Sequence, residues 1–185
     1  MRAGYRRTAA TLAPVATTVF LITGIPGAGK TTVALALAGR FERAAHVEAD
    51  ALQRMIVSGG RWPHEGLDDV ARAQLGLRAR NAGLLAASFF DAGIVPVIDD
   101  IVVGPRRLGI YREVLGERTL QLVVLAPPVE VALARDRGRR DKQVGDRWVH
   151  LDAEQRAGLG NEGVWLDTGQ LTVEQTVDAI LERAP

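Results

Sequence analysis

Cysteine is absent from this chain of 185 residues. Its absence excludes disulfide bonds, thiolate zinc sites, iron–sulfur clusters and thiol nucleophiles. Histidine is scarce, and His46, His64 and His150 are too scattered to suggest a metal cluster. No apolar run reaches the roughly 18 residues of a membrane span, because the best stretch, Leu84–Val97, is interrupted by Asp91. We therefore expect a cytoplasmic protein that does not associate with membranes.

A strong charge of either sign is also absent, since 23 basic and 22 acidic residues leave a formal net charge of +1. This balance argues against a dedicated nucleic-acid-binding or membrane-surface protein. Hydrophobic residues make up 47% of the chain, which excludes disorder for most of it and is enough for one folded domain. Lysine is rare, because all basic residues other than Lys30 and Lys142 are arginine.

Strand and helix patterns begin after residue 17, and residues 1–17 are expected to form a flexible N-terminal tail. Short apolar runs predict strands at Val19–Thr23, His46–Ala49, Ile94–Asp99, Leu120–Ala126 and Val164–Asp167. Helical patterns lie between them at Thr31–Arg40, Ala51–Val57, Pro105–Leu115 and Val129–Arg137, and at Leu67–Ala92 as one helix or two. Thr172 opens a last helix with a capping box. This alternation predicts one α/β domain over residues 18–185, with a five-stranded, doubly wound parallel sheet flanked by helices.

A glycine-rich loop follows the first predicted strand. Gly24–Thr31 fits the pattern G-x-x-x-x-G-K-[ST] at every fixed position, where chance alone gives about 0.002 matches for this composition. The glycines let backbone N–H groups converge on phosphate oxygens, and the next helix directs its positive end to the same place. Lys30 can reach the β- and γ-phosphates, and the Thr31 hydroxyl can ligate Mg²⁺. The motif predicts the phosphate loop of a P-loop NTPase, formed by Gly24, Ile25, Pro26, Gly27, Ala28, Gly29, Lys30, Thr31 and Thr32.

Two aspartates, Asp99 and Asp100, end the third predicted strand. Ligands of open α/β sheets bind at the carboxyl ends of strands, and a carboxylate there can hold Mg²⁺ beside the phosphates. We assign Asp99 to the metal together with Thr31, and Asp100 to the substrate, although either can instead cap the following turn. No glutamate follows the pair and no Asn-Lys-x-Asp signature occurs, which argues against a motor ATPase and a GTPase switch.

Asp50 follows the second predicted strand and opens a helix, with Arg54 four residues later on the same face. Phosphoryl transfer to an alcohol needs an acceptor for the hydroxyl proton, so Asp50 can be the base while Arg54 binds the substrate. The spacing fits a helix cap and a surface ion pair equally well. Trp62 lies in the loop Ser58–Gly66, where it can stack on a substrate or cover the core.

The segment 135–147 holds six basic and three acidic residues. Such a run is usually a solvated helix face, but this one follows the fourth predicted strand, where small P-loop kinases carry a lid. Arginines that close over a triphosphate stabilise transition-state charge and expel water. We predict an arginine-rich lid at about 135–147, with Arg135 and Arg139 on the phosphates. Thr168, after the last predicted strand, is expected near the nucleotide base.

With these elements in place, the chain from about Val19 to Leu181 resembles the small P-loop kinases. It is most similar to the chloramphenicol phosphotransferase-like group, and more distantly to zeta-toxin and polynucleotide-kinase relatives. The matching pieces are GIPGAGKTT at Gly24–Thr32, EAD at Glu48–Asp50, VIDD at Val97–Asp100, ARDRGRRD at Ala134–Asp141, VH at Val149–His150 and LDTG at Leu166–Gly169. The resemblance implies ATP as phosphate donor, Mg²⁺, Asp50 as catalytic base and lid arginines acting on the phosphates. It does not extend to Asp50–Gly66 and Ile101–Arg107, so it implies no particular acceptor.

The sequence therefore predicts an ATP- and Mg²⁺-dependent phosphotransferase that acts on a hydroxyl of a small molecule, either a metabolite or an antibiotic. Its catalytic residues are expected to be Lys30, Asp50, Arg135 and Arg139. Two alternatives share these features: a polynucleotide 5′-hydroxyl or nucleotide-sugar kinase, and an ATP-binding regulator without transfer chemistry. Nucleic acid is not an expected partner, because acidic residues are interleaved with the basic segment.

Overall fold

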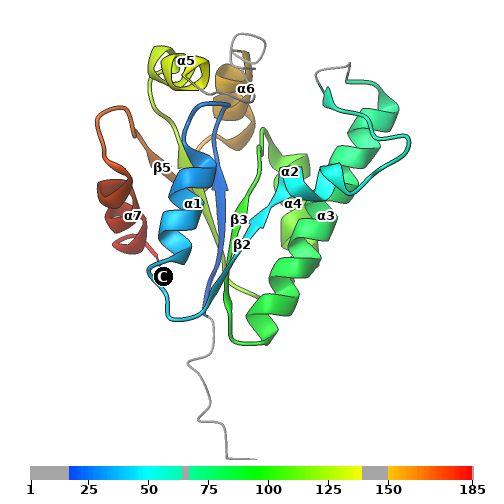
Figure 1. Cartoon of the computed structure of the whole chain (residues 1–185), viewed down its shortest axis with the longest axis horizontal. Coiled ribbons are helices and arrows are strands. Elements are labelled where there is room, and N and C mark those ends of the chain that lie inside the picture. Colours follow the sequence, from blue (N-terminus) through cyan, green and yellow to red (C-terminus); the bar gives the residue numbers. More distant parts are fainter. Residues whose placement is uncertain (1–16, 64–66, 139–149, 185) are drawn as a thin grey trace, which may run out of the picture.

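A five-stranded parallel sheet forms the centre of the fold (Figure 1). The computed structural model describes residues 17–63, 67–138 and 150–184. The strand order is β2-β3-β1-β4-β5. The strands are β1 (Val19–Thr23), β2 (Ala44–Glu48), β3 (Val95–Asp99), β4 (Leu120–Leu125) and β5 (Val164–Leu166). The predicted five-stranded parallel sheet is confirmed, with β1 buried along its whole length between β3 and β4.

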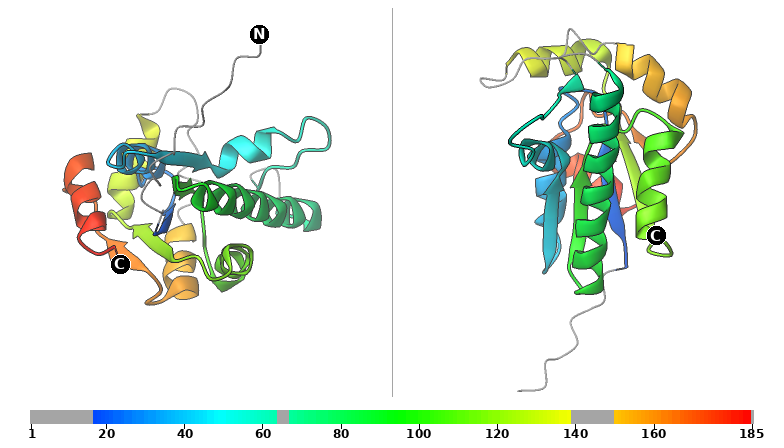
Figure 2. Two further views of the ribbon diagram at one scale, coloured as in Figure 1. Left: turned by 90° about the horizontal axis from the view of Figure 1, so that it is seen from below. Right: turned by 90° about the vertical axis from the view of Figure 1, so that its right-hand side faces the viewer.

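Helices cover both faces of the sheet (Figure 2). On one face lie α1 (Lys30–Ala38), α5 (Val129–Arg137) and α7 (Val173–Leu181). On the other face lie α3 (Asp69–Asp91), α4 (Pro105–Leu115) and α6 (His150–Leu159), and the short α2 (Ala49–Arg54) packs against α3. Successive side chains of a strand point to opposite faces, so Phe20 belongs to one core and Leu21 to the other. This arrangement explains the uninterrupted apolar run of β1.

The boundary between β2 and α2 differs from the prediction. The strand expected at His46–Ala49 ends at Glu48, because β2 pairs with β3 from Ala44 to Glu48. Glu48 is the N-cap of α2, and Asp50 lies inside the first turn of that helix. The alternative in which Asp50 caps the helix is therefore wrong. The predicted ends of β1, α4 and α5 are confirmed, as is the capping box that opens α7.

Helix α6 was not predicted from the sequence. Its buried face includes the polar residue Gln155, so it lacks the apolar stripe by which a surface helix is recognised. Gln155 Nε2 donates to Thr23 Oγ1 (3.1 Å) and to the Val102 carbonyl (2.7 Å). A Cβ on Gly158 would lie 2.4 Å from the Val103 carbonyl oxygen, so α6 contacts this backbone directly. In this way α6 fixes the connection between β3 and α4 to the end of β1.

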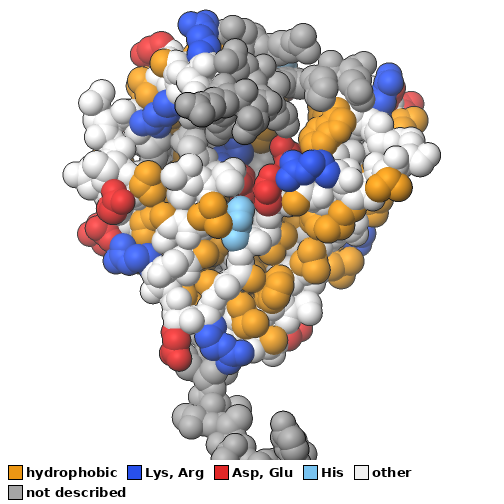
Figure 3. All heavy atoms as spheres, in the orientation of Figure 1, with side chains coloured by type: hydrophobic (Ala, Val, Ile, Leu, Met, Phe, Trp, Pro, Cys, Tyr) orange, Lys and Arg blue, Asp and Glu red, His pale blue; other side chains and the backbone are white. Residues whose placement is uncertain are grey.

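Large hydrophobic side chains are exposed on α3 and in the segment before it, and Figure 3 shows hydrophobic side chains gathered on the right half of this face. Val70, Leu77 and Leu84 follow each other at intervals of seven residues, which places them on one side of α3.

Within the described ranges, no helix combines the length and the apolar character needed to cross a bilayer.

Two predictions concern residues outside the described ranges. The N-terminal tail, predicted at 1–17, falls there except for its last residue. The arginine-rich lid, predicted at about 135–147, is described as far as residue 138, where it forms the end of α5. Arg139 lies outside the described residues.

Candidate active site

The glycine-rich loop lies between β1 and α1 and has the backbone of a phosphate loop. Gly27 and Gly29 have φ values of 81° and 93°, in the left-handed region that favours glycine. A Cβ on Gly27 would lie 2.0 Å from the Ala132 carbonyl oxygen, so the loop packs directly against α5. Gly29 is the N-cap of α1 and makes no side-chain cap. The first amides of α1 and the positive end of its dipole are thus suited to hold an anion.

Lys30 begins α1 and folds back over this loop. Its Nζ donates to the Ile25 carbonyl at 3.2 Å, which keeps the ammonium beside the loop backbone. Thr31 is half-buried, while Thr32 is exposed on the first turn of α1. The structure therefore brings the predicted lysine and hydroxyl residues to the place where the loop would hold phosphates.

The buried Asp99, at the end of β3, interacts with the half-buried Thr31 and His46. Asp99 is 5% exposed, and its Oδ2 has no hydrogen-bond partner among the described residues. His46 Nε2 lies 3.7 Å from that oxygen. Burial alone would raise the pKa of Asp99, but its interactions with His46, Lys30 and Thr31 outweigh this effect and lower the pKa. Carboxylate and hydroxyl oxygens are ligands that Mg²⁺ prefers, so Asp99 and Thr31 fit a magnesium site.

Arg78, which the sequence analysis missed, joins the other two aspartates. Its Nη1 donates to Asp50 Oδ1 at 2.9 Å, and its Nη2 donates to Asp100 Oδ1. Burial opposes the charge on Arg78, but Asp100 and Asp50 outweigh this effect and raise the pKa of the guanidinium. The sequence does contain a signal for this role, because Arg78 lies on the buried face of α3, between Leu75 and Ala82. A charged residue within an apolar stripe needs a buried partner.

Asp100 lies behind the pocket wall, with a side chain that is 1% exposed. It accepts hydrogen bonds from the Tyr111 hydroxyl (2.9 Å) and the Ile101 amide (2.8 Å), in addition to the bond from Arg78. Burial and the charge of Asp100 raise the pKa of Tyr111 well above its usual value, so the phenol remains a neutral donor. Asp100 does not line the pocket described next, and its carboxylate binds Arg78 and Tyr111, so its contact with substrate stays a prediction.

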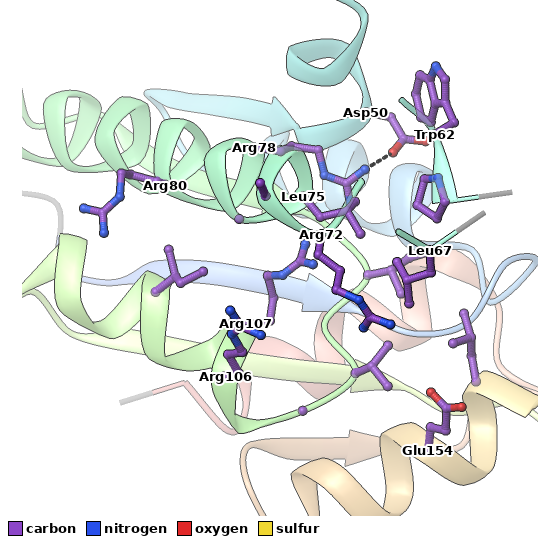
Figure 4. Close-up of a pocket in the computed structure, with 18 of the residues that line it drawn as sticks. Asp50, Trp62, Leu67, Arg72, Leu75, Arg78, Arg80, Arg106, Arg107 and Glu154 are labelled. Carbon is purple, nitrogen blue, oxygen red and sulfur yellow. Dashed lines mark hydrogen bonds and ion pairs between the residues drawn. The ribbon is translucent and has the colours of Figure 1, made fainter. Parts of the chain in front are cut away.

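A pocket of about 860 Å³ opens beside Asp50 (Figure 4). Its size is in the range of small-molecule sites. Trp62 lines the pocket together with Asp50, a position that fits the first of its two predicted roles, and Pro26 connects the pocket to the phosphate loop. Arg54 is not part of the lining, because its Nη2 pairs with Glu48 Oε1 at 3.0 Å on the exposed side of α2. Figure 4 shows Arg78, rather than Arg54, as the arginine bound to Asp50.

Arg135 and Thr168 meet beyond the end of β5. Arg135 Nη2 donates to the Thr168 carbonyl at 3.0 Å. Thr168 is buried, and its Oγ1 has no hydrogen-bond partner within the described part of the chain. The structure thus brings these two predicted nucleotide-binding residues together, and their contacts with a nucleotide remain predictions.

Comparisons with known proteins identify the same fold. A family model described as chloramphenicol phosphotransferase-like protein matches residues 17–184. A comparison with curated proteins finds no match. Among solved structures, a sugar kinase from Janibacter sp. HTCC2649 has a TM-score of 0.65 and 21% identity, covering 90% of this chain and 91% of that chain.

Two further kinases are similar over comparable lengths. A gluconokinase from Sinorhizobium meliloti 1021 has a TM-score of 0.64 and 19% identity, covering 90% of this chain and 91% of that chain. The Mycobacterium tuberculosis APS kinase in complex with AMPPNP and APS has a TM-score of 0.63 and 17% identity, covering 91% of this chain and 97% of that chain. At these identities the similarity shows the fold, and it confirms the predicted P-loop kinase fold.

Proposed function

The chain belongs to the chloramphenicol phosphotransferase-like protein family, and from this premise we propose that it transfers the γ-phosphate of ATP to a hydroxyl group of a small molecule. Membership of this family supports a phosphotransferase. The observation that carries the proposal is the position of Asp50 in a pocket that Pro26 of the phosphate loop also lines. A donor on the loop and an acceptor in the pocket would be neighbours, as direct transfer requires.

The phosphate loop binds the donor. Lys30 and the loop amides hold the β- and γ-phosphates and offset their negative charge. Thr31 and Asp99 hold Mg²⁺, which when bound supplies positive charge to the phosphate oxygens. We assign Arg135 and Arg139 to the same phosphates and Thr168 to the nucleotide base, as the sequence and the family resemblance suggest.

Asp50 acts at the acceptor end. The acceptor hydroxyl oxygen attacks the γ-phosphorus, the bond from that phosphorus to the β–γ bridging oxygen breaks, and ADP leaves. The hydroxyl proton passes to the Asp50 carboxylate. Arg78, on α3, holds the Asp50 carboxylate by a hydrogen bond, and Trp62 offers an apolar face to the acceptor.

We also propose a cytoplasmic location, where ATP is available to such an enzyme.

Replacement of the base tests this assignment. Asp50→Asn keeps the size of the side chain but removes its ability to take a proton. With γ-labelled ATP, Mg²⁺ and a fractionated pool of metabolites and antibiotics, the wild type is expected to label an acceptor. Asp50→Asn is expected to bind ATP normally and to lower kcat by roughly 100- to 10,000-fold. Asp91→Asn, a surface aspartate paired with Arg118, is the matched control and should turn over normally.

Lys30→Ala tests the donor end in the same assay. Loss of the Lys30 ammonium should cost about 2–4 kcal/mol of transition-state stabilisation, by analogy with the removal of one preorganised donor.

Normal turnover by Asp50→Asn would show that the base is assigned wrongly. ATP binding by the wild type without label in any fraction would instead favour the regulator alternative.

A further inference from the structure

More positively charged than negatively charged side chains line the pocket beside Asp50. Three acidic residues line it: Asp50, Asp69 and Glu154. Five arginines line it: Arg72, Arg78, Arg80, Arg106 and Arg107. Figure 4 shows Arg78 directed to Asp50, Arg107 extending from α4 toward α3, and Arg72 extending from α3 toward the side of the pocket where Glu154 lies. Arg80 projects away from them and pairs with Glu113 at 3.0 Å.

Arg107 is half-buried, and its ion pair with Asp100 is a long one. Its side chain is 20% exposed, and its Nη1 lies 3.8 Å from Asp100 Oδ2, beyond hydrogen-bond distance. That carboxylate already binds Arg78 and Tyr111. Arg107 Nη1 has no hydrogen-bond partner in the part of the chain that the structure describes. Burial lowers the pKa of Arg107, and Arg78 adds to this effect while Asp100 opposes it.

The start of α4 adds charge of the same sign. Arg106 and Arg107 lie in its first turn, which holds no acidic residue, and its N-cap, Gly104, has no side chain. The positive end of the helix dipole therefore coincides with two cations, an unfavourable arrangement that an anion would relieve. On α3, Arg72 is exposed, and its side chain makes no ion pair or hydrogen bond with another described residue.

We propose that the pocket binds an acceptor carrying an oxyanion group, either a carboxylate or a phosphate, in addition to the hydroxyl that receives the phosphoryl group. Arg107 is the main partner of the oxyanion, with Arg72 and Arg106 beside it. A planar guanidinium can bind two oxygens of either group at once. Trp62 and Leu67, which line the same pocket, contact the carbon skeleton. The hydroxyl part of this inference rests on the proposed function, whereas the anion site rests on the arginines themselves.

Anion binding can be measured without turnover if the phosphate loop is blocked. The full chain, saturated with Mg²⁺ and AMPPNP, is titrated with inorganic phosphate in one arm and acetate in the other, and the thermal unfolding midpoint is followed. One or both anions should raise the midpoint, and the responding arm distinguishes phosphate from carboxylate. Arg107→Gln should weaken this response by roughly 10- to 100-fold in apparent affinity, and Arg72→Gln, a change of an exposed side chain, should weaken it less.

Arg112→Gln is the matched control, because Arg112 lies on the same helix, is exposed, and pairs with Glu162 outside the pocket. It should keep the full response. A wild-type midpoint that neither anion raises, or an equal response from wild type and Arg107→Gln, overturns the anion site.

The transfer assay then places this site on the acceptor. The metabolite pool is first separated on an anion exchanger, and the labelled acceptor should come from the retained fraction, with a KM that Arg107→Gln raises by roughly 10- to 100-fold. An acceptor from the unretained fraction overturns the inference. An anion response without label in any fraction instead counts against the proposed function while the anion site stands.

Discussion

Arg78 and Arg107 share one aspartate but are held very differently. Arg78 makes hydrogen bonds to both Asp50 and Asp100, and these carboxylates raise its pKa despite burial. Arg107 reaches the same Asp100 only at 3.8 Å, and burial together with Arg78 lowers its pKa. The first arginine therefore stabilises the folded chain, whereas the second is a charge that folding disfavours.

This contrast predicts opposite effects on stability. Arg78→Met should lower the free energy of unfolding by about 3 kcal/mol, since it removes the only cation that hydrogen-bonds the buried Asp100 carboxylate among the described residues. Arg107→Gln should leave that free energy unchanged or raise it, because the group it removes is less easily protonated in the folded chain than in the unfolded one. Urea denaturation without ligand measures both. Equal losses in the two variants would show that both arginines are structural.

Among individual residues, those on the donor side of the site were easier to predict than those on the acceptor side. Lys30 and Thr31 belong to a local motif, and the chemistry of that motif depends on residues that are adjacent in sequence. The role of Arg78 depends on partners 28 and 22 residues away, at Asp50 and Asp100, and therefore on how α3 packs. Arg54 has the helical spacing from Asp50 that favours a pair, yet it binds Glu48.

Among the elements, those with apolar patterns were predicted and the polar one was not. β1 was predicted with its correct ends because both its faces are buried in cores. β2 ends at Glu48 and not at the predicted Ala49, because pairing with β3, rather than local composition, decides where the strand stops. Helix α6 was missed because its main anchor is Gln155, whose amide bonds to Thr23 and Val102.

The close contact of α6 with the connection between β3 and α4 can be tested by a single methyl group. Gly158→Ala would place a Cβ 2.4 Å from the Val103 carbonyl, so α6 must move away. We expect a loss of about 1–3 kcal/mol in unfolding free energy and a higher KM for the acceptor, with ATP binding unchanged.

Gly109→Ala, in α4, provides the control for this experiment. A Cβ there meets nothing within 4 Å, and alanine should stabilise the helix by up to about 1 kcal/mol. The same urea titrations and initial-rate measurements apply to both variants. If Gly158→Ala behaved like Gly109→Ala, α6 would not position the acceptor side of the pocket.

For the molecule as a whole, the fold collects the candidate site at the carboxyl ends of the strands, as open α/β sheets do. The phosphate loop follows β1, Asp50 follows β2, Asp99 ends β3 and Thr168 follows β5. The family match and the kinase fold support a phosphotransferase, and the donor assigned to its phosphate loop is our proposal. In our proposal the acceptor is selected instead by the pocket that residues of α3, α4 and α6 line.

The central claim is that residues 24–32 hold a nucleoside triphosphate, and its most direct test is calorimetric titration of the full chain with ATP in the presence of Mg²⁺. We predict saturable binding at one site that is weakened in Lys30→Ala. In a parallel unfolding experiment, ATP at 100 times its Kd should stabilise the wild type by about 2.7 kcal/mol. Absence of both binding heat and stabilisation, with ATP and with GTP, would contradict the account.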